Sequence, residues 1–308
     1  MPAFDAWLFV DWSANSTPKI GRDSIWIGEA VRIGARTMLR PPINPATRAE
    51  ASEAIAGRLA SHVAARRRVL IGCDFAYGYP SGFAAALGLR GPDPPWRRTW
   101  RALASRISDA PDNANNRWQV AIDLNRRLGG PAGPFWGCPA ASATRELCIG
   151  KGRFPHVTRA GKPLAEYRIV DLRLRASKRT VQSVWKLFTT GSVGSQSLLG
   201  IPRLQALTRD PRLAPWSRVW PLETGFTDRI TPPETGPCIV HAEVWPRIIP
   251  DDGDPTMVLD ARQVSALARH FADLDSHGKL APLFDRPPDL TDAEIETICR
   301  EECWVLGT

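Results

Sequence analysis

Two aspartates each end a short apolar segment. Asp11 ends the run Trp-Leu-Phe-Val-Asp at 7–11, and Asp74 ends the run Val-Leu-Ile-Gly-Cys-Asp at 69–74. Runs of this length and composition are typical of buried strands, and open α/β sheets place their ligands at the carboxyl ends of strands. A carboxylate there is costly unless it is paired, hydrogen-bonded or bound to a cation. We therefore expect Asp11 and Asp74 to bind a hard divalent metal or a substrate, or else to cap the turns that follow them.

Asp260 is a third acid that could reach the same place. It begins a predicted helix at 260–277 and shares a face with Val264 and Leu267, because four residues turn a helix by about 400°. That face is expected to pack on the sheet, which would bring Asp260 near the strand ends. Asp260 followed by Gln263 also matches a helix N-cap, and both interpretations stay open.

Glu243 is the remaining catalytic candidate. It lies with His241 on one face of a predicted strand at 238–245, since alternate residues of a strand point the same way. The two side chains could form an acid–base pair, or His241 could be a satisfied core residue. An interior carboxylate needs a partner, and a metal near the strand ends would supply one for Glu243.

Two glutamates of the first predicted helix, at 47–66, are poorer candidates. Glu50 and Glu53 lie opposite the apolar stripe of this helix. Thr47 and Glu50 also have the spacing of a capping box, which explains Glu50 structurally. We expect both glutamates to face water.

A small-residue loop at 191–197 could bind an anion. Its hydroxyls and exposed backbone amides suit an anion or substrate, although it has neither the Walker A ending nor the Rossmann glycine pattern. The alternative is a plain connecting turn. The residues expected to bind a cofactor or substrate here are Ser192, Gly194, Ser195 and Gln196.

Tryptophans and arginines alternate in the segment 96–101, Trp-Arg-Arg-Thr-Trp-Arg. This composition suits stacking on bases and pairing with phosphates. At helical spacing, however, Trp96 and Trp100 share a face, which is more typical of core packing with the arginines outside.

The apolar patterns predict an α/β fold in a single domain, 1–308, with an insertion at about 80–165. An antiparallel meander comes first, and its third strand is expected to end at Pro41-Pro42 because proline cannot donate to a ladder. The long segment 129–163 has little periodicity and suggests a lid, an insertion or a binding loop. Strands are expected at 7–12, 24–33, 36–40, 69–74, 166–175, 217–222 and 238–245, and helices at 47–66, 177–188, 260–277 and 291–301, with mostly helical structure over 80–128.

The composition limits the class of protein and its partners. No apolar run is long enough for a membrane helix, and six scattered cysteines without a CxxC pair favour reduced thiols. We therefore expect a cytoplasmic protein. The net charge of +8 suits an acidic partner such as nucleic acid or a phosphorylated small molecule. Only six of the 40 basic residues are lysines, and an arginine excess of this kind also arises from GC-rich coding.

The order of elements resembles the core of the ribonuclease H-like superfamily: a strand with Asp11, two antiparallel strands, a helix, and a strand with Asp74. Several short motifs are similar to the DUF429 branch of that superfamily, whose members are predicted nucleases. These motifs are Asp-Phe-Ala-Tyr-Gly-Tyr-Pro at 74–80, Glu243 before Trp-Pro, the late helix at Asp260, and Glu-Cys-Trp-Val-Leu-Gly at 302–307.

The resemblance implies a ribonuclease H-like mixed sheet flanked by helices, with helical and loop insertions, and metal-dependent phosphodiester chemistry. In that superfamily, acids from the first strand, the first helix, the buried strand and the last helix hold two divalent cations. Asp11, Asp74 and Asp260 match three of these positions as ligands for Mg²⁺ or Mn²⁺. The chain departs from the pattern at the first helix, where Glu50 faces the wrong way.

Three functions remain open. The leading hypothesis is a metal-dependent hydrolase, a nuclease in particular, with Glu243 completing the site. An enzyme acting on a small phosphorylated metabolite or cofactor precursor, with 191–197 as its anion loop, is the first alternative. A non-catalytic binding or regulatory module on the same fold is the second. Actin-like kinases share the sheet core, but their phosphate-loop glycines after the first strand are missing.

Overall fold

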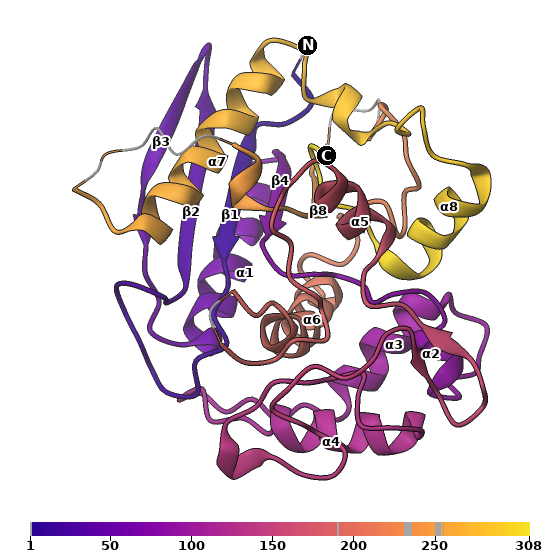
Figure 1. The fold of residues 1–308 in the computed structure, drawn as a ribbon. Helices are drawn as coiled ribbons and strands as arrows, with labels where there is room; N and C mark the ends of the chain where they lie inside the picture. The colour runs from indigo at the N-terminus through magenta and orange to yellow at the C-terminus, as the bar shows by residue number, and fades with distance from the viewer. Residues whose placement is uncertain (1, 190, 231–235, 250–253, 255) are drawn as a thin grey trace.

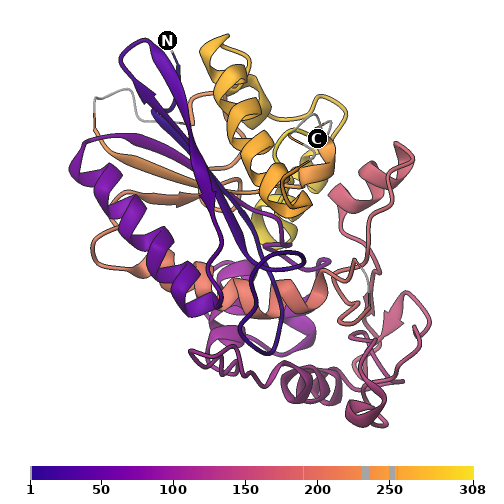
Figure 2. The same cartoon turned by 90° about the vertical axis from the view of Figure 1, so that its left-hand side faces the viewer.

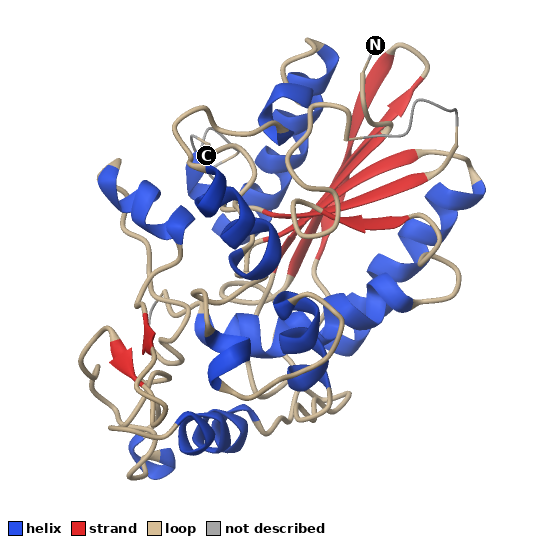
Figure 3. Cartoon of the chain, turned by 90° about the vertical axis from the view of Figure 1, so that its right-hand side faces the viewer, coloured by secondary structure: helices blue, strands red, loops and turns tan. Residues whose placement is uncertain are grey.

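A mixed sheet of six strands forms the centre of the computed structural model, which describes residues 2–189, 191–230, 236–249, 254 and 256–308. The strand order is β3-β2-β1-β4-β8-β7; β2 is antiparallel to both of its neighbours, and β1, β4, β8 and β7 run parallel. Helices lie on both sides of the sheet (Figure 3), which confirms the predicted α/β class. The strands are β1 (Ala6–Asp11), β2 (Trp26–Ile33), β3 (Arg36–Ile43), β4 (Arg68–Cys73), β7 (Ser217–Val219) and β8 (Cys238–Glu243).

Two helices cover opposite faces of this sheet, α1 (Arg48–Ala64) on one and α7 (Leu259–Ser276) on the other (Figure 1, Figure 2). Strand β1 is buried between them. Leu8 and Val10 belong to the core on the α1 side, whereas Trp7 and Phe9 belong to the core on the α7 side. The charged end of β1 therefore emerges from a fully apolar strand.

Helix α7 can approach β2 because residue 28 is a glycine. A Cβ atom at Gly28 would lie 2.4 Å from the carbonyl oxygen of Val264, a distance that real Cβ atoms do not tolerate. Asp260 lies one helical turn before Val264. The contact at Gly28 therefore determines how near the start of α7 comes to the strand ends.

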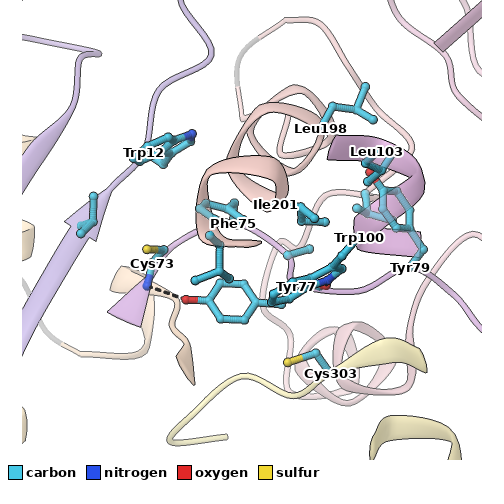
Figure 4. Close-up of a cluster of buried hydrophobic side chains, with 14 of the residues drawn as sticks. Trp12, Cys73, Phe75, Tyr77, Tyr79, Trp100, Leu103, Leu198, Ile201 and Cys303 are labelled. Carbon is cyan, nitrogen blue, oxygen red and sulfur yellow. Dashed lines mark hydrogen bonds between the residues drawn. The ribbon is translucent and has the colours of Figure 1, made fainter. Parts of the chain in front are cut away.

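Aromatic side chains connect the end of the sheet to a second layer of helices. Figure 1 places α6 (Gly194–Arg209) and α3 (Pro95–Ala104) beyond the carboxyl ends of β1 and β4. Trp12, Phe75 and Tyr77 form a row in which successive ring centroids are 5.9 and 5.3 Å apart. Figure 4 shows this row leading to Trp100, with the Tyr77 hydroxyl accepting the amide hydrogen of Cys73. The segments after β1 and β4 are therefore held rigidly.

Three element predictions are wrong. Strand β3 continues through Pro41-Pro42, which is tolerated because β3 lies at the edge of the sheet. The expected strand at 166–175 is instead helix α5 (Ile169–Ala176), at whose start the Asp171 carboxylate accepts the backbone amide of the N-cap residue Arg168 over 3.0 Å. The expected helix at 177–188 is absent, and this segment is irregular.

The other helical elements pack around this frame. The segment 129–163 has little regular structure, as expected, and contains one 3-10 turn and a two-stranded hairpin. Within the described part of the chain, no helix is long and apolar enough to cross a membrane. The remaining elements are α2 (Phe83–Ala86), α4 (Arg117–Leu128), η1 (Ala140–Ser142), β5 (His156–Val157), β6 (Pro163–Leu164), η2 (Pro246–Ile248), η3 (Ala281–Phe284), α8 (Asp292–Thr297) and the π-helical η4 (Ile298–Glu302).

Candidate functional site

Asp11 and Asp74 lie side by side at the ends of two adjacent parallel strands. Val10 of β1 pairs with Cys73 of β4, so the next residue of each strand reaches the same edge of the sheet. The Asp74 amide donates to the carbonyl oxygen of Val10 over 3.2 Å, and the Trp12 amide donates to Asp74 Oδ1 over 2.7 Å. The carboxyl groups of Asp11 and Asp74 are within hydrogen-bonding reach of each other.

The two acids share a strongly acidic environment. Burial raises the pKa of Asp11 well above its usual value, and the charges of Asp74, Asp260 and Asp23 raise it further. Burial also raises the pKa of Asp74, to about 7, although the hydrogen bond from the Trp12 amide opposes this rise. The pair therefore holds on to a proton near neutral pH, which is the behaviour of two carboxyls that share a site.

Asp260 lies near this pair but is held by a different loop. Its Oδ2 accepts the Asp23 amide over 2.7 Å, and the Ser24 amide is a second donor. Its charge raises the pKa of both Asp11 and Asp74. The N-cap interpretation is wrong, because the helix begins at Leu259 and Val258 is the N-cap. The carboxylate instead closes the loop between β1 and β2.

The donor set suits a hard divalent cation. Asp11 and Asp74 present carboxylate oxygens, and Mg²⁺ is commonly bound by one or two carboxylates together with water and substrate phosphates. Among the described residues, no group of three or more His, Cys, Asp or Glu side chains is arranged to hold a metal. Of the three predicted metal ligands, Asp11 and Asp74 are thus the two that contact each other directly. The role of Asp260 as a ligand stays a prediction.

Glu243 is buried in an ion pair that the sequence did not reveal. Arg168 Nη2 donates to Glu243 Oε1 and Nη1 donates to Oε2, each over 2.7 Å, and the Tyr77 amide donates to Oε2 over 2.9 Å. Arg168 also pairs with Asp171 over 3.0 Å. The partner expected for this carboxylate is therefore an arginine, and Glu243 joins β8 to α5 and to the segment after β4.

His241 does not form an acid–base pair with Glu243. Its Nε2 lies 3.1 Å from Ser217 Oγ on the neighbouring strand, and burial lowers its pKa to about 3. A neutral, fully buried imidazole of this kind is a core residue. His241 is therefore a core residue, as the alternative interpretation held, although its Nδ1 has no hydrogen-bond partner among the described residues.

The predictions for the first helix are confirmed. Glu50 and Glu53 are exposed; Glu50 accepts the Ala46 amide while its own amide donates to Thr47 Oγ1. Arg48 of α1 contacts the loop that follows β1. It forms a buried ion pair with Asp109 and donates to the carbonyl oxygens of Ser13 and Asn15, so it fixes the loop that follows Asp11.

The predicted anion loop forms the start of α6. Gly194 donates its amide to the carbonyl oxygen of Lys186, and Ser195 Oγ donates to that of Leu187 over 2.6 Å. The Gln196 side chain donates to the carbonyl oxygen of Trp12. These bonds attach the helix start to the end of β1, close to the acids.

An open cleft of about 780 Å³ contains the acids and the start of α6. The irregular segment 129–163 takes no part in its walls, which come instead from segments near 180–196 and 243–247. Of the predicted residues Gly194 alone lies outside the lining. Asp11, Asp74, Glu243, Asp260, Ser192, Ser195 and Gln196 all line the cleft, together with Arg117, Arg168, Phe188 and Arg247, which the sequence patterns missed.

The tryptophan–arginine segment is structural. Trp96 and Trp100 are buried with ring centroids 4.9 Å apart. Arg97 pairs with Glu223, and Arg101 pairs with Asp93. The core-packing interpretation is therefore correct.

Comparison with known proteins does not assign the chain to a family. No protein-family model matches it, and no curated protein or solved structure does so either. The geometry of the cleft is therefore the basis for a functional proposal.

Proposed function

We propose that this chain is a metal-dependent hydrolase of the ribonuclease H-like type that acts on phosphodiesters as a nuclease. One observation carries the proposal: the acids Asp11 and Asp74 meet at the ends of adjacent parallel strands, in a cleft, among further acids that raise their pKa. The strand order and the nearby Asp260 support it. Acids with strongly raised pKa values in a cleft are typical of functional sites.

Asp11 and Asp74 would hold Mg²⁺ or Mn²⁺. Bound there, the metal would lower the pKa of an attacking water and offset the charge of the phosphodiester. The Trp12 amide orients the Asp74 carboxylate through Oδ1, and a cation bound there would replace the hydrogen bond that this carboxylate shares with Asp11. Asp11 must first release its proton, and Asp260 adds negative charge that favours a cation over an anion at this point.

A titration with Mn²⁺ tests the metal site directly. We expect Mn²⁺ to raise the melting temperature of the wild-type chain, because a ligand that binds only the folded state stabilises it. The increase should disappear in Asp11→Asn and in Asp74→Asn. Asp123→Asn is the matched control, since Asp123 is an exposed residue of α4 outside the cleft. Equal increases in all four proteins, or no increase in any, would overturn the metal site.

A substrate panel then identifies the reaction. Single- and double-stranded DNA, RNA, nucleotides and small phosphate esters should be incubated with the wild-type chain and Mn²⁺. Cleavage of a polynucleotide that EDTA and Asp74→Asn both abolish is the expected result. Cleavage of small esters alone would favour a metabolite enzyme. Binding without cleavage that is lost at moderate salt would favour a binding module.

A further inference from the structure

Arg117, the first residue of α4, is a buried cation without an acidic partner in the described part of the chain. It is only 8% exposed and lines the cleft. Its Nη1 donates to Ser16 Oγ and Asn115 Oδ1, each over 2.9 Å. Its Nε is buried without a partner among the described residues. Burial and the nearby Arg48 lower its pKa to about 10, and the charge of Asp109 opposes this fall. Asp109 is already paired with Arg48 and Arg203, so the position remains unfavourable for a cation without an ion-pair partner of its own.

The free edge of this guanidinium has the shape of a phosphate-binding group. Nε and Nη2 form one side of the arginine fork, and neither has a hydrogen-bond acceptor among the described residues. Because Nε is buried, a phosphate would reach this edge through Nη2, by a charge-assisted hydrogen bond. Arg168 is the contrasting case in the same cleft, because Glu243 and Asp171 already occupy its donors.

The start of α6 brings further donors to the same cleft. Helix α6 has 16 residues, and its first amides point out of the helix without intrahelical partners. The Gly194 amide donates to the carbonyl oxygen of Lys186, whereas the amides of Ser195 and Gln196 have no acceptor among the described residues. A helix start of this kind favours an anion.

A short segment, Leu187-Phe188, connects Arg117 with the start of α6. The carbonyl oxygen of Leu187 accepts Ser195 Oγ, and the ring of Phe188 packs edge-on against Trp118, 6.0 Å between centroids. Trp118 follows Arg117 and lies under its guanidinium. The orphaned arginine and the free amides therefore belong to one wall of the cleft.

We propose that Arg117 and the Ser195 and Gln196 amides form a subsite for a phosphate group of the substrate, apart from the carboxylates that would hold the metal. The subsite deepens the proposed function and rests on it for the reaction. Phe188 is 41% exposed and lines the same cleft, so it offers a ring on which a base can stack. The substrate class is therefore a nucleotide unit, with its phosphate on Arg117 and its base on Phe188.

Binding measured without divalent cations tests the subsite separately from the metal. In EDTA, calorimetric titrations should compare inorganic phosphate, a 5′-mononucleotide and a short single-stranded oligonucleotide. We expect the mononucleotide and the oligonucleotide to bind more tightly than phosphate, because only they can stack on Phe188. Arg117→Gln should weaken all three at least about tenfold. Arg126→Gln is the matched control: it removes an exposed arginine of the same helix that lies outside the cleft and should change binding less than about twofold.

Backbone amide shifts provide a second measurement that does not depend on a variant. Phosphate added to the wild-type chain should shift the amide resonances of Ser195 and Gln196 more than those at the start of α7. Equal losses of affinity in Arg117→Gln and Arg126→Gln, or unshifted amide resonances, would overturn the subsite. Asp11→Asn should still bind phosphate. If Mn²⁺ fails to bind but Arg117→Gln still weakens phosphate binding, the hydrolase proposal is wrong and the subsite stands.

Discussion

The amide of Trp12 donates to Asp74 Oδ1 over 2.7 Å, and this bond makes the two neighbouring acids unequal. It stabilises the ionised form of Asp74, whereas the interaction with Asp74 raises the pKa of Asp11. Both effects favour protonation of Asp11 over protonation of Asp74. A cation that binds both oxygens must displace this proton, which makes the site sensitive to pH around neutrality.

The first prediction concerns stability against pH. Both acids have a folded-state pKa above the unfolded value of about 3.9, so the folded chain binds more protons than the unfolded chain between about pH 4 and 7. The free energy of unfolding contributed by the pair must then fall as the pH rises through this window. Urea unfolding at pH 5 to 8 should show that the double variant Asp11→Asn, Asp74→Asn gains roughly 1 to 3 kcal/mol over the wild type as the pH rises. If the free energies of unfolding of the two proteins changed in parallel with pH, the prediction would be wrong.

A second prediction concerns protons released on metal binding. Because burial raises the pKa of Asp74 to about 7 and that of Asp11 well above its usual value, Mn²⁺ that binds at pH 7 should release protons from the site. Calorimetry in buffers of different ionisation enthalpy measures this number, and the apparent Kd should weaken as the pH falls from 8 to 6. Binding enthalpies that do not depend on the buffer would show that the metal binds elsewhere.

A third prediction concerns the buried ion pair behind the cleft. Arg168→Gln leaves Glu243 and Asp171 buried without their partner, and breaking such a pair costs about 3 to 5 kcal/mol. Arg173→Gln is the same substitution in α5, where the partner Asp289 is exposed, and it should change stability little. Urea unfolding of both variants gives the comparison; similar losses would mean that the buried network is not what holds α5.

A fourth prediction concerns the approach of α7 to β2. Gly28→Ala places a methyl group 2.4 Å from the Val264 carbonyl oxygen, and overpacking of this kind costs about 1 to 3 kcal/mol. The displaced helix should also move Asp260 away from the Asp23 amide. Gly57→Ala is the control, since a Cβ there meets open space within α1, and it should stabilise the chain by about 0.5 to 1 kcal/mol. Thermal unfolding should show a lower melting temperature for Gly28→Ala and a higher one for Gly57→Ala.

Much of the central sheet follows from local patterns. Strands β1 and β4 are continuous apolar runs, and α1 has a clear stripe, so periodicity locates these elements together with Asp11 and Asp74. The position of Asp260 near the sheet follows from its helix face. Its actual hydrogen bonds do not, because the donors belong to a loop 237 residues away.

Other features depend on contacts that no local pattern contains. Helix α5 has only eight residues, and the network of Arg168 with Glu243, 75 positions away, holds it in place. The sequence pattern of such a short basic segment is equally compatible with a strand. Arg117 looks like any surface arginine at a helix start, and only the folded chain shows that it is buried beside Arg48.

The hydrogen bond between Asp23 and Asp260 also has a consequence for synthesis of the chain. The two residues are 237 positions apart, so at 5–20 residues per second a ribosome needs roughly 12 to 47 s to pass from one to the other. During most of that time the strands bearing Asp11 and Asp74 can form, but β8 is made only near the end of the interval and α7 only after it. The acidic centre is therefore completed late in translation, after β8 and α7 have been made.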